Sequence, residues 1–262
     1  MTKIRRTAPT LAFTREISPR IVECELTHLA RSPIDLTRAR EEHEAYEGAL
    51  RALGCRVHRL TAGDDMADSV FIEDTAVVLD EIAIITRPGA ASRRRETAAV
   101  REALEPYRRV SEITEPGTLD GGDVLRAGRR LLVGDGPRSN AEGRRQLAQL
   151  VRADGYNVEA IPFAGCLHLK TAATLVADDV VLINPQWVDA AAFGGLRTIA
   201  VDPSEPFAAN AVQIGNAVIH ADEFPRTRRR LERAGIKVVT VPAGELAKAE
   251  GGVTCCSLLL SR

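Results

Sequence analysis

The sequence predicts a five-bladed α/β propeller, in which five small sheets surround a central axis. Three observations predict it. Four stretches each read as two short strands joined by a tight turn, each is followed by a helical stretch and one more strand, and the two chain ends together supply a fifth such unit. The units recur at a period of about 50 residues, as expected for a propeller.

The four strand pairs have the turn chemistry of β-hairpins. Their turns read LDE, RAGR, ADD and GN, which are rich in residues that favour tight turns. The predicted hairpins span residues 69–86, 119–135, 169–185 and 210–222. The helical stretches span residues 93–107, 139–155, 185–195 and 225–235. The last strands span residues 108–114, 156–163, 196–203 and 236–243.

The fifth unit is split between the chain termini. A strand at residues 10–16, a helix at 35–54 and a strand at 55–60 lack a hairpin partner, which the apolar stretch 253–260 supplies. Pairing of the last strand with the first would close a ring, so residues 1–262 are expected to form one catalytic domain. A doubly wound α/β sheet also alternates strands and helices, but it predicts single strands rather than hairpins between helices.

The composition excludes several classes of partner. The formal net charge of −1 gives no reason to expect nucleic acid, and no run approaches the roughly 18 apolar residues of a membrane span. The basic N-terminal stretch has no apolar segment typical of a signal peptide. Five scattered cysteines, without CxxC or HxxxH spacing, predict free thiols in the cytoplasm and no zinc site. The oligomeric state is left open, with a homodimer as one alternative.

Polar clusters occur where the first strands of the units begin. Alone, each has an ordinary explanation, because an Asp beside Gly-Gly is usually a turn and a buried Cys is usually a small apolar residue. The repeat, however, places these clusters at equivalent points of different blades, so that they face one cavity. They are Asp68 with Glu73 and Asp74, Asp120 with Asp123, His168 with Lys170, and Cys255 with Cys256.

This set of side chains indicates nucleophilic chemistry on a cation. A Cys with a His supports thiolate attack and proton delivery to a leaving group. A carboxylate beside the His favours its protonated form, and further carboxylates suit a guanidinium, which offers a fork of donors. Neighbours on a strand face opposite sides, so only one of Cys255 and Cys256 is expected to face the cavity.

The motifs resemble those of the dimethylarginine dimethylaminohydrolases, members of the guanidino-modifying superfamily with the five-bladed pentein fold. The resemblance extends in order from about Leu11 to the C-terminus, in the stretches DSVFIEDTAVV, ITRPGAASRRRE, TLDGGDVL, RSNAEG, LHLK, AAN and GGVTCCSLL. It implies hydrolysis of Nω-methylated L-arginine to L-citrulline and an amine through a covalent thiouronium, with no metal or organic cofactor.

The resemblance also implies residue roles. Cys255 would be the nucleophile, His168 the general acid and base, and Asp120 the acid that supports His168. Strand alternation favours Asp68 and Asp74 as pocket-facing acids, with Glu73 behind them. The expected substrate contacts are Asp68 with the α-amino group, Glu73 and Asp74 near the guanidinium, Arg93 and Arg138 with the α-carboxylate, and the backbone of Leu26 and Ala249.

Alternative functions stay open at this point. An arginine deiminase would act on unmodified arginine, but the classical enzymes carry an inserted helical domain for which 262 residues leave no room. A hydrolase of another guanidino amino acid would share the core motifs. A non-enzymatic propeller that binds a partner would need neither the Cys, His and acid set nor the arginine pair.

Overall fold

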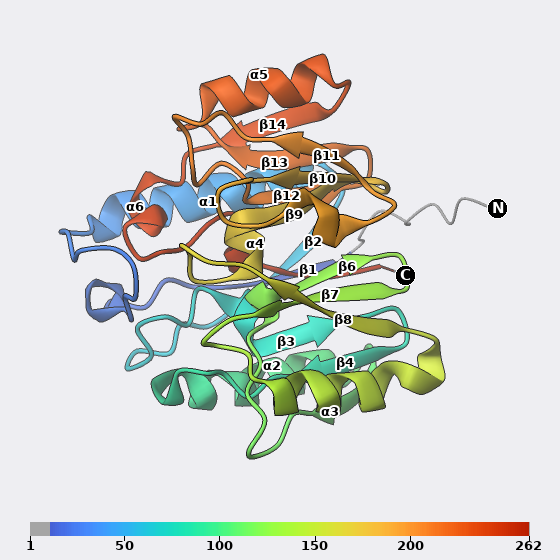
Figure 1. Cartoon of the computed structure of the whole chain (residues 1–262). Helices are drawn as coiled ribbons and strands as arrows, with labels where there is room; N and C mark the ends of the chain where they lie inside the picture. Colours follow the sequence, from blue (N-terminus) through green and yellow to red (C-terminus); the bar gives the residue numbers. More distant parts are fainter. Residues whose placement is uncertain (1–10, 262) are drawn as a thin grey trace.

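Five three-stranded sheets form the framework of the computed structural model, which describes residues 11–261 (Figure 1). In each sheet the first two strands are antiparallel and the next one is parallel to the middle strand. The prediction of a five-bladed α/β propeller is confirmed. The sheets are β3 (Ala76–Val78), β4 (Ile82–Ile85), β5 (Arg109–Glu112); β6 (Val124–Ala127), β7 (Arg130–Asp135), β8 (Asn157–Pro162); β9 (Ala173–Ala177), β10 (Val180–Ile183), β11 (Arg197–Ala200); β12 (Ala211–Ile214), β13 (Ala217–Ala221), β14 (Lys237–Val241); and β15 (Leu258–Leu260), β1 (Leu11–Arg15), β2 (Arg56–Leu60).

The last strand closes the ring as expected. β15 pairs antiparallel with β1, with Leu260 opposite Leu11 and Leu258 opposite Phe13, and β1 in turn pairs parallel with β2. Thr10 of the predicted first strand lies outside the described residues. The chain end is therefore part of a sheet, and its apolar side chains are explained by burial.

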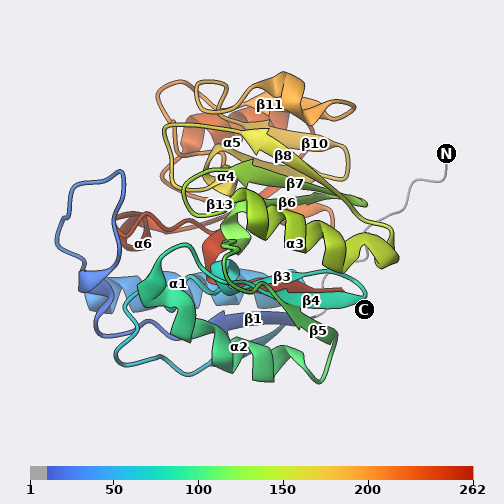
Figure 2. The same ribbon diagram turned by 60° about the horizontal axis from the view of Figure 1, so that its bottom comes forward.

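The long helices lie on the outside of the sheets (Figures 1 and 2). The first of them begins at Asp35, whose carboxylate accepts hydrogen bonds from the backbone of Thr37 and Arg38 at 2.9 and 3.1 Å, as an N-cap does. The helices are α1 (Leu36–Ala52), α2 (Thr97–Leu104), α3 (Ala141–Val151), α4 (Leu169–Ala172), α5 (Pro225–Arg233) and α6 (Gly244–Ala247). The short 3-10 helices are η1 (Ile21–Glu23), η2 (Ile72–Thr75), η3 (Ala91–Glu96), η4 (Gly121–Asp123), η5 (Arg152–Asp154), η6 (Ala190–Phe193) and η7 (Thr254–Cys256).

The prediction of a helix at residues 185–195 was wrong. The structure has only the single 3-10 turn η6 there. Asp189 begins the turn by accepting a hydrogen bond from the backbone of Ala191, and Gly194 and Gly195 end it, so the segment is too short for an α-helix.

The hydrophobic core is divided into wedges between neighbouring blades. One cluster joins β1, β15, β3, β4 and α2, and corresponding clusters lie between each further pair of adjacent sheets. No helix within residues 11–261 is long and apolar enough to span a membrane. A cavity of about 160 Å³ lies among the strands at the axis.

Truncating Leu258 tests the ring closure. Leu258 is buried among Leu11, Phe13 and Ile72, so Leu258→Ala should lower the free energy of unfolding by about 2–5 kcal/mol. The neighbouring Leu259 is only partly buried, and Leu259→Ala serves as the matched control with a smaller loss. Urea denaturation measures both, and equal losses in the two variants would contradict a sealed β1–β15 pair.

Candidate active site

The polar clusters lie immediately before the first strands of their sheets. Glu73 and Asp74 belong to η2 before β3, Asp120 precedes η4 and β6, and His168 begins α4 before β9. Cys255 lies in η7 before β15. The pseudo-fivefold arrangement thus gathers these residues at one end of the axis, as the repeat predicts.

One pocket collects most of the predicted site residues. Asp120 lies directly behind it, whereas Glu73 and Leu26 are not among its lining residues. The predicted residues that line it are Asp68, Asp74, Arg93, Arg138, His168, Ala249 and Cys255.

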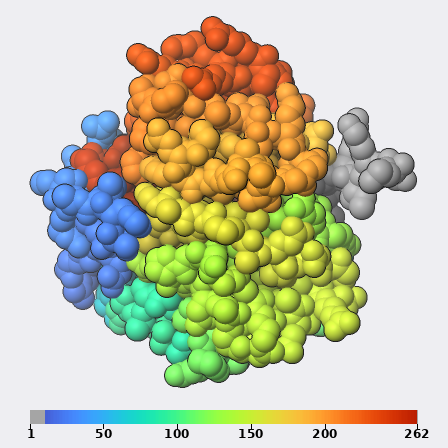
Figure 3. All heavy atoms as spheres, viewed as in Figure 1, coloured from blue at the N-terminus to red at the C-terminus, as the bar shows by residue number. Residues whose placement is uncertain are grey.

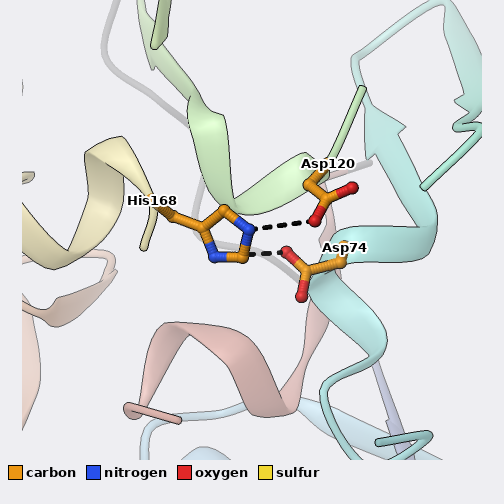
Figure 4. A group of neighbouring side chains, drawn as sticks. All are labelled: Asp74, Asp120 and His168. Atoms are coloured by element: carbon orange, nitrogen blue, oxygen red, sulfur yellow. Dashed lines mark hydrogen bonds and ion pairs between the residues drawn. The ribbon is translucent and has the colours of Figure 1, made fainter. Parts of the chain in front are cut away.

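His168 faces two carboxylates (Figure 4). Its Nε2 is 3.0 Å from Oδ2 of Asp120, and its Nδ1 is 3.9 Å from Oδ1 of Asp74. Burial by itself would lower the pKa of His168, but the negative charges of Asp74, Asp120 and Asp123 outweigh it and raise that pKa to about 9. His168 is therefore protonated at neutral pH.

Two features of the TLDGGDVL stretch hold this histidine. The carboxylate of Asp123 accepts hydrogen bonds from the backbone of Leu169 at 3.0 Å and from the Ser139 hydroxyl at 2.6 Å. A Cβ at Gly122 would lie 2.9 Å from Nδ1 of His168, so only glycine allows the close approach. Asp123 had no assigned role from the sequence, although its position in the DGGD motif was the signal.

Asp74 is held as an anion by cations on two sides. Its Oδ2 accepts from Nη1 of Arg93 at 2.5 Å, and its Oδ1 accepts from the backbone of Gly122 at 3.0 Å. Burial would raise the pKa of Asp74, but His168 and Arg93 lower it to about 2. Arg93 also pairs with Glu96 at 2.9 Å, so it is already surrounded by acids, and its expected contact with a substrate carboxylate stays a prediction.

Glu73 points to a different cavity. Its Oε1 accepts from Nζ of Lys170 at 2.6 Å, and its Oε2 accepts from the Thr254 hydroxyl at 2.7 Å. It lines the axial cavity rather than the pocket of His168 and Cys255. The alternation argument for Asp74 and Glu73 was wrong in its premise, because η2 is a 3-10 helix in which successive side chains diverge by about 120°.

The prediction of a strand at the two cysteines was also wrong. Residues 254–256 form η7, and its backbone N–H groups bond within the turn, as from Cys255 to the carbonyl of Gly252 at 3.1 Å, rather than along a sheet. The two side chains nevertheless diverge. Cys255 lines the pocket, whereas Cys256 is buried in the core beside α1. Burial, together with Glu73 and Asp74, raises the pKa of the Cys255 thiol to about 12.

The N-terminal loop covers the pocket. One carboxylate oxygen of Glu250 accepts from three consecutive backbone N–H groups, those of Thr27, His28 and Leu29, at 3.0, 2.5 and 2.6 Å. Asp68 accepts from the backbone of Glu25 at 3.2 Å. Figure 3 shows this N-terminal part of the chain, in blue, at the left side of the molecule. Only about 20 Å³ of the pocket is left free.

Two predicted residues lie at this loop, and their substrate contacts stay predictions. Leu26 packs against the core rather than lining the pocket, and its backbone contact with substrate stays a prediction. Arg138 is half-buried at the pocket and donates to the Thr27 hydroxyl at 3.2 Å, which places it beside the covering loop. The contact between Glu250 and the covering loop was not predicted, because nothing local in the sequence marks a contact over more than 200 residues.

The site also has the geometry of a metal cluster. Single ligand atoms of Asp74, Asp120 and His168 lie within 4.8 Å of one another. Protein groups already engage them, since His168 bonds Asp120 and Arg93 pairs with Asp74. The expectation of no metal stays a prediction.

The reactivity of Cys255 should follow its raised pKa. Without substrate, its alkylation by iodoacetamide should be slow at neutral pH and rise continuously to about pH 10, because the thiolate fraction grows throughout this range. Peptide mass spectrometry locates the modified cysteine. A rate that levels off near pH 7 would contradict a thiol held neutral by burial and acids.

Comparisons with known proteins show which family the chain belongs to. No family model matches the sequence. The chain is 41% identical over 250 residues to the N(G),N(G)-dimethylarginine dimethylaminohydrolase of Streptomyces coelicolor, covering 95% of this chain and 96% of the relative. A solved structure of the Pseudomonas aeruginosa enzyme, a cysteine-to-serine variant complexed with citrulline, has a TM-score of 0.93 and 31% identity, covering 97% of this chain and 100% of that one. A histidine-to-glycine variant of a dimethylarginine dimethylaminohydrolase, as an adduct with S-methyl-L-thiocitrulline, has a TM-score of 0.91 and 31% identity, covering 96% and 100%. The chain belongs to the dimethylarginine dimethylaminohydrolase family.

Proposed function

We propose that this protein hydrolyses Nω-methylated L-arginine to L-citrulline and methylamine or dimethylamine, with Cys255 as the nucleophile. The observation that carries the proposal is one pocket lined by both Cys255 and His168, a histidine that Asp74 and Asp120 keep protonated. Family membership supports the same reaction. A peptide substrate, whose reacting group is neutral, would not need this concentration of carboxylates.

The substrate is a small cationic amino acid in this proposal. Asp74 and Asp68 supply negative charge for the guanidinium and the α-amino group, and Arg138 supplies a donor fork for the α-carboxylate. Arg138 therefore favours a free amino acid as substrate over agmatine, which has no carboxylate. The covering loop has to move before substrate enters, because about 20 Å³ cannot hold an amino acid.

In the first half-reaction, the guanidinium carbon is attacked. The docked cation lowers the pKa of Cys255 from its value of about 12, and the thiol proton leaves to solvent. A bond forms between Sγ and the guanidinium carbon. His168 gives its proton to the methylated nitrogen, the C–N bond breaks, and the neutral amine leaves a thiouronium on Cys255.

In the second half-reaction, water replaces sulfur. Neutral His168 takes a proton from water as the oxygen bonds the carbon. The C–S bond then breaks, and its electron pair returns to Sγ. Loss of the hydroxyl proton leaves the ureido group of citrulline. The sum is one water consumed and one amine released.

Residues 1–262 act as one catalytic domain in this proposal. The homodimer left open by the sequence stays an alternative. The cytoplasmic location inferred from scattered cysteines fits the free thiols of Cys24, Cys166, Cys255 and Cys256.

A substrate panel tests the proposal. Citrulline should form from asymmetric dimethylarginine and monomethylarginine with kcat/KM at least about 100-fold above that for arginine, and chelator treatment should leave the rate unchanged. A preference for arginine would indicate a deiminase instead, and loss of activity with chelator would assign a metal to Asp74, Asp120 and His168.

Two cysteine variants test the nucleophile. Cys255→Ser should lower citrulline formation below about 10⁻³ of the original rate, because a hydroxyl is a far weaker nucleophile than a thiolate. Cys256→Ala, at the buried neighbour, is the matched control and should retain kcat. Full activity in Cys255→Ser would exclude Cys255 as the attacking group.

A further inference from the structure

A set of polar groups lies beside the reacting residues, and four of its five members line the axial cavity. The first strands of all five sheets, β3, β6, β9, β12 and β15, line that cavity. Just before each of them lies one member of the set, and the members contact one another around the axis. These residues, here called the polar ring, are Glu73, Gly121, Lys170, Asn210 and Thr254.

The polar ring is closed by hydrogen bonds. Lys170 Nζ donates to Oε1 of Glu73 at 2.6 Å and to the carbonyl of Gly121 at 3.1 Å. The Thr254 hydroxyl donates to Oε2 of Glu73 at 2.7 Å. Asn210 Nδ2 donates to Oγ1 of Thr254 at 3.0 Å and to the carbonyl of Lys170 at 3.2 Å. The Thr254 backbone N–H donates to Oδ1 of Asn210 at 2.9 Å.

The ring is enclosed by protein. Glu73, Asn210 and Thr254 are 7%, 8% and 6% exposed. A lost contact would leave a buried polar group without its partner, which is costly. A Cβ on Gly252 would lie 2.6 Å from the Asn210 side chain, so glycine at this position allows the amide to lie against the η7 turn.

All ring members except Asn210 lie within two residues of a site residue in the sequence. Glu73 precedes Asp74, Gly121 follows Asp120, and Thr254 precedes Cys255. Lys170 lies two residues after His168, in the same short helix that His168 begins. Fixing the ring therefore fixes the mutual positions of nucleophile, acid and carboxylates, which come from separate blades.

We propose that Asn210, Thr254 and Lys170 are positioning residues, which act through the polar ring to hold the Cys255 turn against the His168 helix. Neither the AAN stretch that contains Asn210 nor Lys170 has had a role up to this point. The inference rests on the proposed function for its kinetic readout. Thr254 links three blades, because its backbone N–H and its hydroxyl both donate hydrogen bonds to residues of other blades.

The ring should matter for the chemical step more than for binding. Attack by sulfur and proton delivery by His168 require the two groups in a fixed geometry, and small displacements cost rate steeply. The pocket residues Asp68 and Arg138, which face the amino acid portion of the substrate, are outside the ring. Loosening the ring should therefore lower kcat and leave KM nearly unchanged.

Four variants test the proposal. Thr254→Val removes the hydroxyl at nearly constant shape, and Thr254→Ser keeps it. Asn210→Ala removes the amide. Asn184→Ala is the matched control, because Asn184 is also buried and bonds backbone groups at 2.9 Å, but it lines neither the pocket nor the axial cavity. The readouts are kcat and KM for dimethylarginine, thermal unfolding, and the iodoacetamide alkylation rate of Cys255 without substrate.

In Thr254→Val and Asn210→Ala, kcat should fall about 10- to 100-fold with KM within about 3-fold, while Cys255 alkylation at pH 8 becomes faster because the loosened thiol is more exposed. Thr254→Ser should restore kcat to within about 3-fold, and Asn184→Ala should change neither rate. Equal losses in both Thr254 variants, or in both asparagine variants, overturn the proposal. If the unaltered protein forms no citrulline, the proposed function fails, and unchanged alkylation in Thr254→Val and Asn210→Ala would separately overturn the ring.

Discussion

The pairing of β15 with β1 is the constraint on which the rest of the structure depends. It closes five sheets around one axis, and it brings η7, near the chain end, into the same centre as η2, η4 and α4. Without closure, Cys255 would be on a loose terminus, and Asp74, Asp120 and His168 would lack the reacting thiol. The leucines of the last strand therefore close the propeller, and the closed propeller holds the cysteine that precedes them in the site.

Within that propeller, electrostatics divides the polar residues into two groups. Near the pocket, Asp74 and Asp120 hold His168 protonated, and Arg93 balances the negative charge. In the polar ring, Glu73 forms an ion pair with Lys170 and accepts a hydrogen bond from Thr254, so its charge stabilises the ring. Burial, together with the charges of Glu73 and Asp74, keeps the Cys255 thiol neutral by raising its pKa, and a bound cation is then the natural partner that makes it a nucleophile.

Apart from the helix expected at residues 185–195, the sequence was sufficient for the architecture and for bringing the site residues together, because hairpin turns, helix ends and clusters at strand starts are local and repeated signals. It failed where a local rule was extended too far. Strand alternation was applied to Glu73 and Asp74 and to the two cysteines, which lie in 3-10 turns. The roles of Asn210 and Glu250 were missed because their partners are tens to hundreds of residues away, and only the folded ring brings them together.

The central claim, covalent attack by Cys255 at a guanidinium carbon, is tested most directly by trapping the intermediate. The protein would be mixed with dimethylarginine, quenched in acid within milliseconds, digested, and examined by fragmentation mass spectrometry. The account predicts an adduct on Cys255 with the mass of the substrate less dimethylamine. Citrulline formation without such an adduct, or with the adduct on Cys256, would contradict it.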